Sequence, residues 1–360
     1  MTPNPQSTSG SVGRSLLPLL VVLALALVFH FLLGPFIGEF RTAVVKQMGI
    51  AVIAAVSLNI VNGFTGQFSM GHAGFMTVGG YVGAFCTYYG GMYFFGSTGR
   101  VGGFMGAGEW LLVGGCLTGG LFAALCGYAV GLPSLRLRGD YLAIVTLGFG
   151  EIVRTMLQQT GSQGYDKGEF ASGDASWWPL PVGGAQGFKF LPSSTNLFWV
   201  WLFAGITILA AFRLKQSSMG RAFLSIREDE IAARAMGIDL AKYKVRAFVL
   251  AAFFAGIAGV LLGHSGVNLS PSDAGFLRSF ELIIMVVLGG LGSISGAVVA
   301  AVILSVLPEL LRDFAQFRLI VYALLLIIMM LVRPQGLFGI SEVWDIFRRP
   351  RRATKKGVAR

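Results

Sequence analysis

Long apolar runs separated by short polar segments are the dominant pattern of this chain of 360 residues. Runs with few or no charges lie at 16–33, 43–61, 71–90, 110–130, 141–157, 197–212, 247–265 and 318–332. A helix needs about 20 predominantly apolar residues to cross a membrane. The pattern therefore predicts an all-α, polytopic integral membrane protein with about eight transmembrane helices.

The interval 279–310 departs from this pattern, because two short apolar pieces flank the glycine-rich sequence from Gly289 to Gly296. Neither piece alone is long enough to span comfortably. We therefore expect a broken or re-entrant helical hairpin. It either enters and leaves by one face or crosses twice as two short helices.

Basic residues indicate the orientation of the chain. The segment 213–246 carries eight basic residues against four acidic ones, and seven of the last thirteen residues are basic. Lys and Arg near span ends collect on the cytoplasmic side. We therefore expect cytoplasmic segments at 1–15, 213–246 and 341–360, an outer loop at 158–196, and a transmembrane domain over 16–340.

Composition supports the membrane class and excludes others. Hydrophobic residues make up 54% of the chain and charged residues 12%, where a soluble domain has about 45 to 50% and about 25%. The chain has three histidines, no HExxH and no GxxxxGKS or GxxxxGKT, so we predict no catalytic residue, no metal site and no ATP site on it. Much of the net charge of +11 lies in the basic tail, which favours a membrane-lipid anchor over nucleic acid.

Glycine is unusually frequent, with 51 residues, and recurs at four-residue spacing. Examples are the pairs Gly79 with Gly83 and Gly259 with Gly263. Small residues let membrane helices approach closely, so plain helix packing is the favoured interpretation.

Two charge-free polar segments are candidates for a translocation pathway. They contain Asn59, Asn62, Thr65, Gln67, Ser69 and His72 in the first half of the chain, and Ser293 and Ser295 in the second. Non-helical backbone at membrane depth is tolerated where it is buried in protein or lines a cavity. For the first segment a short polar cytoplasmic turn remains the alternative, and His72 can be a hydrogen-bonding residue at a helix start.

The loop at 213–246 contains a short amphipathic segment. It consists of Arg227, Glu228, Asp229, Glu230, Ile231, Ala232, Ala235, Met236 and Gly237. The three acidic residues suit the start of a helix, the apolar residues form one stripe, and the final glycine can end the helix. Such a helix is suited to lie in a groove of a cytoplasmic partner, with an interfacial helix on lipid as the alternative.

Several motifs of the sequence resemble those of a known family. GRAFLSIREDEIAARAMGIDLAKYKVRAFVLAAFFAGIAG at 220–259 is similar to the ATPase-contacting loop of permease subunits of branched-chain amino acid ABC importers. Further matching motifs are GQFSMGHAGFMTVGGYVGAF at 66–85, LRLRGDYLAIVTLGFGEIVR at 135–154, VVLGGLGSISGAVVAAVIL at 286–304 and RPQGLFG at 333–339. Their order along one chain is more specific than any single piece.

The resemblance implies a multi-pass protein of a bacterial inner membrane that imports branched-chain or related amino acids. Its partners would be a homologous second permease, two cytoplasmic ATPases that carry ATP and Mg, and a periplasmic binding protein. Arg227 to Gly237 would be the coupling helix, and Asn59 to His72 with Gly289 to Gly296 would lie near the pathway. Urea, short amides or other amino acids are alternative cargoes, and an ion-coupled secondary transporter is the alternative class.

Overall fold

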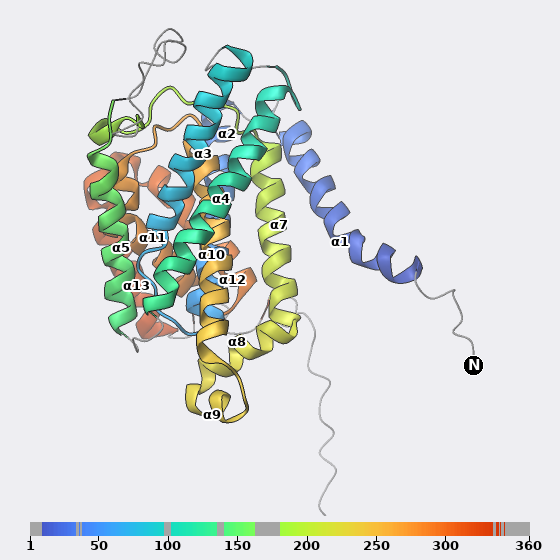
Figure 1. Ribbon diagram of the computed structural model, residues 1–360, viewed down its shortest axis with the longest axis vertical. Coiled ribbons are helices and arrows are strands. Elements are labelled where there is room, and N and C mark those ends of the chain that lie inside the picture. The colour runs from blue at the N-terminus through green and yellow to red at the C-terminus, as the bar shows by residue number, and fades with distance from the viewer. Residues whose placement is uncertain are drawn as a thin grey trace, which may run out of the picture.

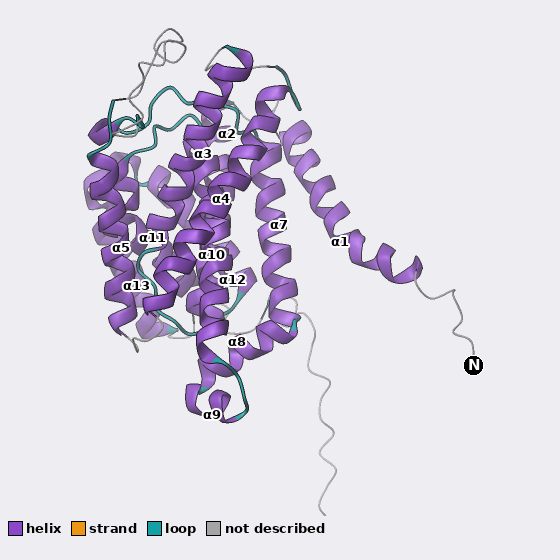
Figure 2. Cartoon of the chain, in the orientation of Figure 1, coloured by secondary structure: helices purple, strands orange, loops and turns teal. Residues whose placement is uncertain are grey.

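The computed structural model describes residues 9–33, 36, 38–96, 102–134, 140–162, 181–333, 336, 337, 339 and 342. Over these residues the protein is a helical bundle without a β-sheet (Figures 1 and 2). Helical segments at 39–64, 107–132, 197–216 and 240–263 are each long and apolar enough to cross a membrane, and shorter apolar helices lie at 17–32 and 294–310. The all-α, polytopic class is therefore confirmed, and the count of about eight spans stays a prediction.

The helices follow the apolar runs of the sequence. Their bounds are α1 (Ser9–Val28), α2 (Glu39–Asn59), α3 (His72–Phe95), α4 (Ala107–Ser134), α5 (Asp140–Gln158), α7 (Leu197–Gln216), α8 (Ser218–Glu228), α9 (Glu230–Ala235), α10 (Leu240–Gly263), α11 (Phe276–Gly289), α12 (Ile294–Leu310) and α13 (Arg318–Val332). Short π or 3-10 helices lie at Phe29–Leu33, Ile60–Phe64, Gly184–Gln186, Pro271–Ala274 and Arg312–Phe317. Figure 1 shows α9 projecting from one end of the bundle, which we call the α9 end.

Glycines bring α3, α4 and α10 into backbone contact at the centre of the bundle. A Cβ atom at Gly79 would lie 2.2 Å from the Cα of Gly256, and one at Gly259 would lie 1.8 Å from the Met76 carbonyl oxygen. A Cβ atom at Gly119 would lie 2.4 Å from the Gly79 carbonyl oxygen. The predicted role of glycine in close helix packing is thus confirmed for these helices.

Helix α2 is the buried element against which the second half of the chain packs. Every residue from Gly49 to Asn59 is buried, and α7, α10, α11 and α12 all contact this helix. Helix α1 instead lies at the periphery beside α7 (Figure 1). It begins at Ser9, so its first residues belong to the polar segment 1–15, which we expected to precede the first helix. A helix can extend into such a segment because each residue added to its end gains one hydrogen bond. Residues 1–8 are outside the described part.

The interval 279–310 forms two short helices, α11 and α12, joined by residues 290–293. The two helices pack at their junction, where a Cβ atom at Gly289 would lie 2.4 Å from the Gly296 carbonyl carbon. The predicted break into two short helices is therefore confirmed, and whether the pair re-enters by one face or crosses twice stays a prediction. Residues 163–180 of the expected outer loop and most of the basic tail lie outside the described residues.

Gly259→Ala should destabilise the protein by about 1 to 3 kcal/mol, because the added methyl group overlaps the α3 backbone at Met76. Thermal unfolding of the detergent-solubilised protein would measure this loss. Gly114→Ala on α4 is the matched control, since nothing lies within 4 Å of its Cβ position. Equal melting temperatures for the two variants would contradict the packing argument.

Candidate translocation and coupling site

The first polar segment of the sequence is a break between two helices. Helix α2 continues through the π-helical turn Ile60–Phe64, and residues 65–71, which we call the α2–α3 break, are not helical. The Met70 amide donates a hydrogen bond to Thr146 Oγ1 (3.0 Å), and the Ala73 amide donates one to Ser279 Oγ (3.3 Å). Helix α5 therefore contacts the non-helical break itself, and α11 contacts the first turn of α3 that follows it, so that this irregular backbone is held against protein.

The predicted pathway residues all fall within the described part of the chain. Asn59, Asn62, Thr65, Gln67, Ser69, His72 and Ser293 are buried, and Ser295 is half-buried. Most of their polar atoms have protein partners: the Thr65 hydroxyl donates to the Val61 carbonyl oxygen (2.7 Å), and Ser57 Oγ lies 2.8 Å from His72 Nε2.

Asn62 and Ser69 keep unused hydrogen-bonding capacity. Asn62 Oδ1 accepts a hydrogen bond from the Ser69 amide (3.2 Å). Among the described residues, neither Asn62 Nδ2 nor Ser69 Oγ has a protein partner, although both atoms are buried. Buried donors without partners are uncommon and costly, so these two groups are suited to bind an acceptor that enters the segment.

The structure joins the two polar segments, which lie more than 200 positions apart in the sequence. The Asn59 side chain donates from Nδ2 to the Ser293 carbonyl oxygen (2.9 Å), and its Oδ1 accepts from the Gly292 amide (2.9 Å). We call residues 290–293 the α11–α12 turn. Gly63 permits this contact, since a Cβ atom there would lie 2.5 Å from the Gly292 nitrogen.

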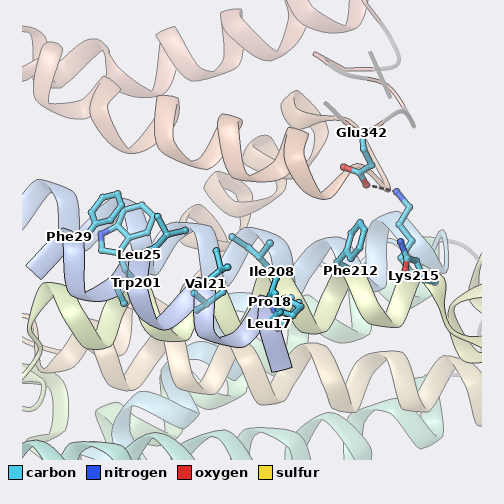
Figure 3. Close-up of a pocket in the computed structure, with 15 residues that line it drawn as sticks. Leu17, Pro18, Val21, Leu25, Phe29, Trp201, Ile208, Phe212, Lys215 and Glu342 are labelled. Atoms are coloured by element: carbon cyan, nitrogen blue, oxygen red, sulfur yellow. Dashed lines mark hydrogen bonds and ion pairs between the residues drawn. The ribbon is translucent and has the colours of Figure 1, made fainter. Parts of the chain in front are cut away.

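Two ionic side chains from other parts of the chain bind this turn and the start of α12. Lys215, at the end of α7, donates to the Gly292 carbonyl oxygen (2.8 Å) and forms an ion pair with Glu342 (2.5 Å), drawn in Figure 3 beside the groove between α1 and α7. Glu342 accepts hydrogen bonds from the amides of Ile294 (3.2 Å) and Ser295 (3.1 Å), and from the Ser295 hydroxyl (2.7 Å). A carboxylate at this position caps α12 and complements its dipole.

The sequence did not single out Lys215 or Glu342. Lys215 counted only as one basic residue of the 213–246 loop, and Glu342 is one of two acidic residues between the last apolar run and the basic residues of the tail. A third missed residue is Glu109 at the opposite end of the bundle. This buried carboxylate accepts hydrogen bonds from Trp199 Nε1 (2.9 Å), the Met105 amide (3.0 Å) and Asn196, and it fastens α4 to α7.

The predicted amphipathic helix is divided differently in the structure. Arg227 and Glu228 end α8, and Asp229 caps α9 by accepting hydrogen bonds at Oδ1 from the amides of Ile231 (2.7 Å) and Ala232 (3.0 Å). The expectation that Glu228 opens the helix is therefore wrong. Of the three consecutive acidic residues, only Glu230 lies inside α9. Asp229 takes the cap position instead, because an aspartate accepts hydrogen bonds from amides at a cap better than within a helix.

Helix α9 is small but firmly attached. Ala233 packs against Ile226 of α8 and Leu240 of α10, and Glu230 forms an ion pair with Lys244 (2.6 Å). The helix ends before Gly237, whose positive φ of 84° suits glycine.

The predicted apolar stripe faces away from the protein. Ile231 and Met236 are 81% and 82% exposed, and Ala232 and Ala235 are exposed as well. An anchored helix whose apolar side chains are left uncovered by the described residues is typical of a docking surface. Across the described residues there is no cluster of three or more His, Cys, Asp or Glu side chains that could hold a metal ion.

Glu342→Gln should lower the stability of the protein by about 1 to 3 kcal/mol at neutral pH, because the half-buried Lys215 ammonium loses its charge partner. Burial by itself raises the pKa of Glu342, but hydrogen bonds from Lys215 and Ser295 outweigh it and place the pKa below the ordinary 4.5. A carboxylate with a lowered pKa stabilises fully above pH 4.5 and loses this contribution as the pH falls further. The melting temperature should therefore fall below this pH in the wild type, and less so in the variant.

Glu309→Gln is the control for this experiment, since the Glu309 contact with Arg312 is long (3.7 Å) and exposed. Thermal unfolding from pH 7 downward would compare the two variants. An equal loss of stability in both would refute the proposed strength of the Lys215–Glu342 pair.

Comparison with known proteins assigns the chain to a family. The family model described as branched-chain amino acid transport system, permease component, matches residues 40–333. The high-affinity branched-chain amino acid transport system permease protein LivM of Escherichia coli is 34% identical over 98% of this chain and 80% of its own length. LivH of Salmonella typhimurium is 33% identical over 45% of this chain and 53% of its own length.

A more distant relative is the probable branched-chain amino acid transport permease protein LivM of Methanocaldococcus jannaschii, 26% identical over 84% of this chain and 89% of its own length. No solved structure matches the chain. The relatives are transport permease subunits, which is a non-enzymatic role. The family match, the apolar helices and the buried breaks lead to one conclusion: the chain belongs to the branched-chain amino acid ABC transporter permease family, whose members are multi-pass membrane proteins.

Proposed function

We propose that this chain is a transmembrane permease subunit of a binding-protein-dependent ABC importer. It works with a homologous second permease, two cytoplasmic ATPases and a periplasmic binding protein. Its cargo is a branched-chain or related amino acid. The α9 end and both chain termini face the cytoplasm of the bacterial cell.

The exposed apolar surface of α9 carries this proposal. Ile231 and Met236 project from a helix that Asp229, Ala233 and Glu230 fix to the bundle. A short helix with an apolar face is a common element for docking into a groove of a partner protein. The ATPase is the natural partner at this end, because the segment 213–246 carries the excess of basic residues typical of cytoplasmic loops.

The relatives support the cargo and the permease pair. LivM and LivH are both named as permease proteins of a high-affinity branched-chain amino acid transport system. This chain matches LivM over nearly its whole length and LivH over less than half of it. We infer that it occupies the LivM position in a pair of two related permeases.

Ala235→Glu should uncouple transport, since a charge placed in the apolar α9 surface would be buried without a partner in the ATPase groove. We expect ATPase association to weaken by about tenfold or more, while the permease remains in the membrane. Co-purification and ATP-driven leucine uptake in proteoliposomes would measure both. Ala107→Glu, also at an exposed alanine but at the opposite end of the bundle, is the control.

Normal uptake and ATPase binding by Ala235→Glu would reject the docking assignment. Uptake driven by an ion gradient with no ATPase present would instead support a secondary transporter.

We further propose that the polar residues of the two breaks line the pathway. These residues are Asn59, Asn62, Thr65, Gln67, Ser69, His72, Ser293 and Ser295. The spare donors of Asn62 and Ser69 support this proposal, because they can bind passing carboxylate or carbonyl oxygens. In this conformation most of these polar side chains are buried, so cargo reaches them only after the breaks separate.

Asn62→Ala and Gln67→Ala should lower the uptake rate roughly two- to tenfold, since each removes one neutral hydrogen-bonding group. The preference among leucine, isoleucine and valine should not change, because weak polar contacts let cargo leave and selectivity resides in the binding protein. Competition assays with the three amino acids and with unrelated ones would test this. A new order of preference in either variant would place a selective site in this chain.

A further inference from the structure

One side chain connects the ATPase-facing loop to both helix breaks. Arg227 lies at the end of α8 and is half-buried. Its Nη1 donates hydrogen bonds to the Gly63 carbonyl oxygen (2.9 Å), beside the α2–α3 break, and to the Leu291 carbonyl oxygen (3.4 Å) in the α11–α12 turn. A single guanidinium thus touches backbone from both halves of the chain.

Glycines on both sides leave room for this arginine. A Cβ atom at Gly292 would lie 2.5 Å from Arg227 Nη1, and one at Gly66 would lie 3.1 Å from its Cγ. Both glycines have positive φ angles, 87° at Gly292 and 68° at Gly66, which other residues rarely adopt. The backbone of both breaks is therefore shaped around the Arg227 side chain.

The residues that flank Arg227 attach the end of α8 to α9. Its neighbour Ile226 is buried against Ala233 of α9 and Leu240 of α10, and Asp229, two residues further on, caps α9. The end of α8 and α9 therefore move together, because a buried contact and a cap both resist their separation. A displacement of α9 would move the Arg227 head group relative to Gly63 and Leu291.

We propose that Arg227 is the positioning residue that transmits movement of α9 to the two breaks. This inference rests on the proposed function, in which α9 docks into the ATPase. While Arg227 holds both carbonyl oxygens, the α2–α3 break and the α11–α12 turn stay together. When the ATPase displaces α9, the guanidinium leaves one or both oxygens and the breaks can separate.

The test uses the complete importer in proteoliposomes and three readouts: ATPase co-purification, ATP hydrolysis and leucine uptake. Arg227→Met should retain ATPase binding but transport about tenfold less leucine for each ATP hydrolysed, since both charge-assisted hydrogen bonds are lost. Arg227→Lys keeps the charge but lacks the planar fork, so it should fall between Arg227→Met and the wild type. Arg221→Met, on the same helix at an exposed position, should match the wild type.

A wild-type ratio of leucine to ATP in Arg227→Met would overturn the inference. A second result would also overturn it: a lower melting temperature and weaker ATPase binding in Arg227→Met, with an unchanged ratio of leucine to ATP. That result would describe a purely structural residue. A failure of the proposed function would be visible in the wild type, because the unmodified permease would then bind no ATPase. The inference about Arg227 would be rejected together with the proposed function. Arg227→Lys keeps the test decisive if Arg227→Met does not fold.

Discussion

The α11–α12 turn is the constraint on which the α9 end of the molecule depends. Only some of its backbone groups pair locally, as the Ser293 amide does with the Gly290 carbonyl oxygen (3.0 Å), because positive φ angles at Gly290 and Gly292 leave the turn in an irregular conformation. Buried backbone groups require hydrogen-bonding partners. Asn59, Lys215 and Arg227 supply them to the turn itself, and Glu342 caps the helix that follows. Segments from across the chain are thereby fixed to one point.

The rest of the bundle is organised by close approach of helix backbones. Helices α3, α4 and α10 touch through Gly79, Gly119, Gly256 and Gly259, where a methyl group would overlap backbone atoms. Inside a membrane, apolar side chains gain little by leaving lipid for other side chains, so tight packing of small residues takes over the role of the hydrophobic effect. The helix breaks differ from this tightly packed centre, because they are held by a small number of specific hydrogen bonds.

The α8–α9 loop combines two properties that a coupling element requires. Its outer face is apolar and uncovered at Ile231 and Met236, and its inner face is fixed by Ala233 and by the ion pair of Glu230 with Lys244. Arg227 reaches from the same loop to both breaks. A partner that moves α9 would thus act on the interior through a short series of defined contacts, without deforming the glycine-packed centre.

The sequence alone determined the elements, because hydropathy runs and glycine spacing are local properties that set where helices form and where they can pack closely. The broken hairpin at 279–310 and the polar break after Asn59 could be predicted for this reason. Only the tertiary structure decided that Asn59 binds the turn at Gly292, that Lys215 pairs with Glu342 across 127 positions, and that Arg227 belongs to α8 and joins both breaks. Such contacts depend on how all helices pack together, and no spacing within the sequence encodes which distant backbone groups are left to be paired.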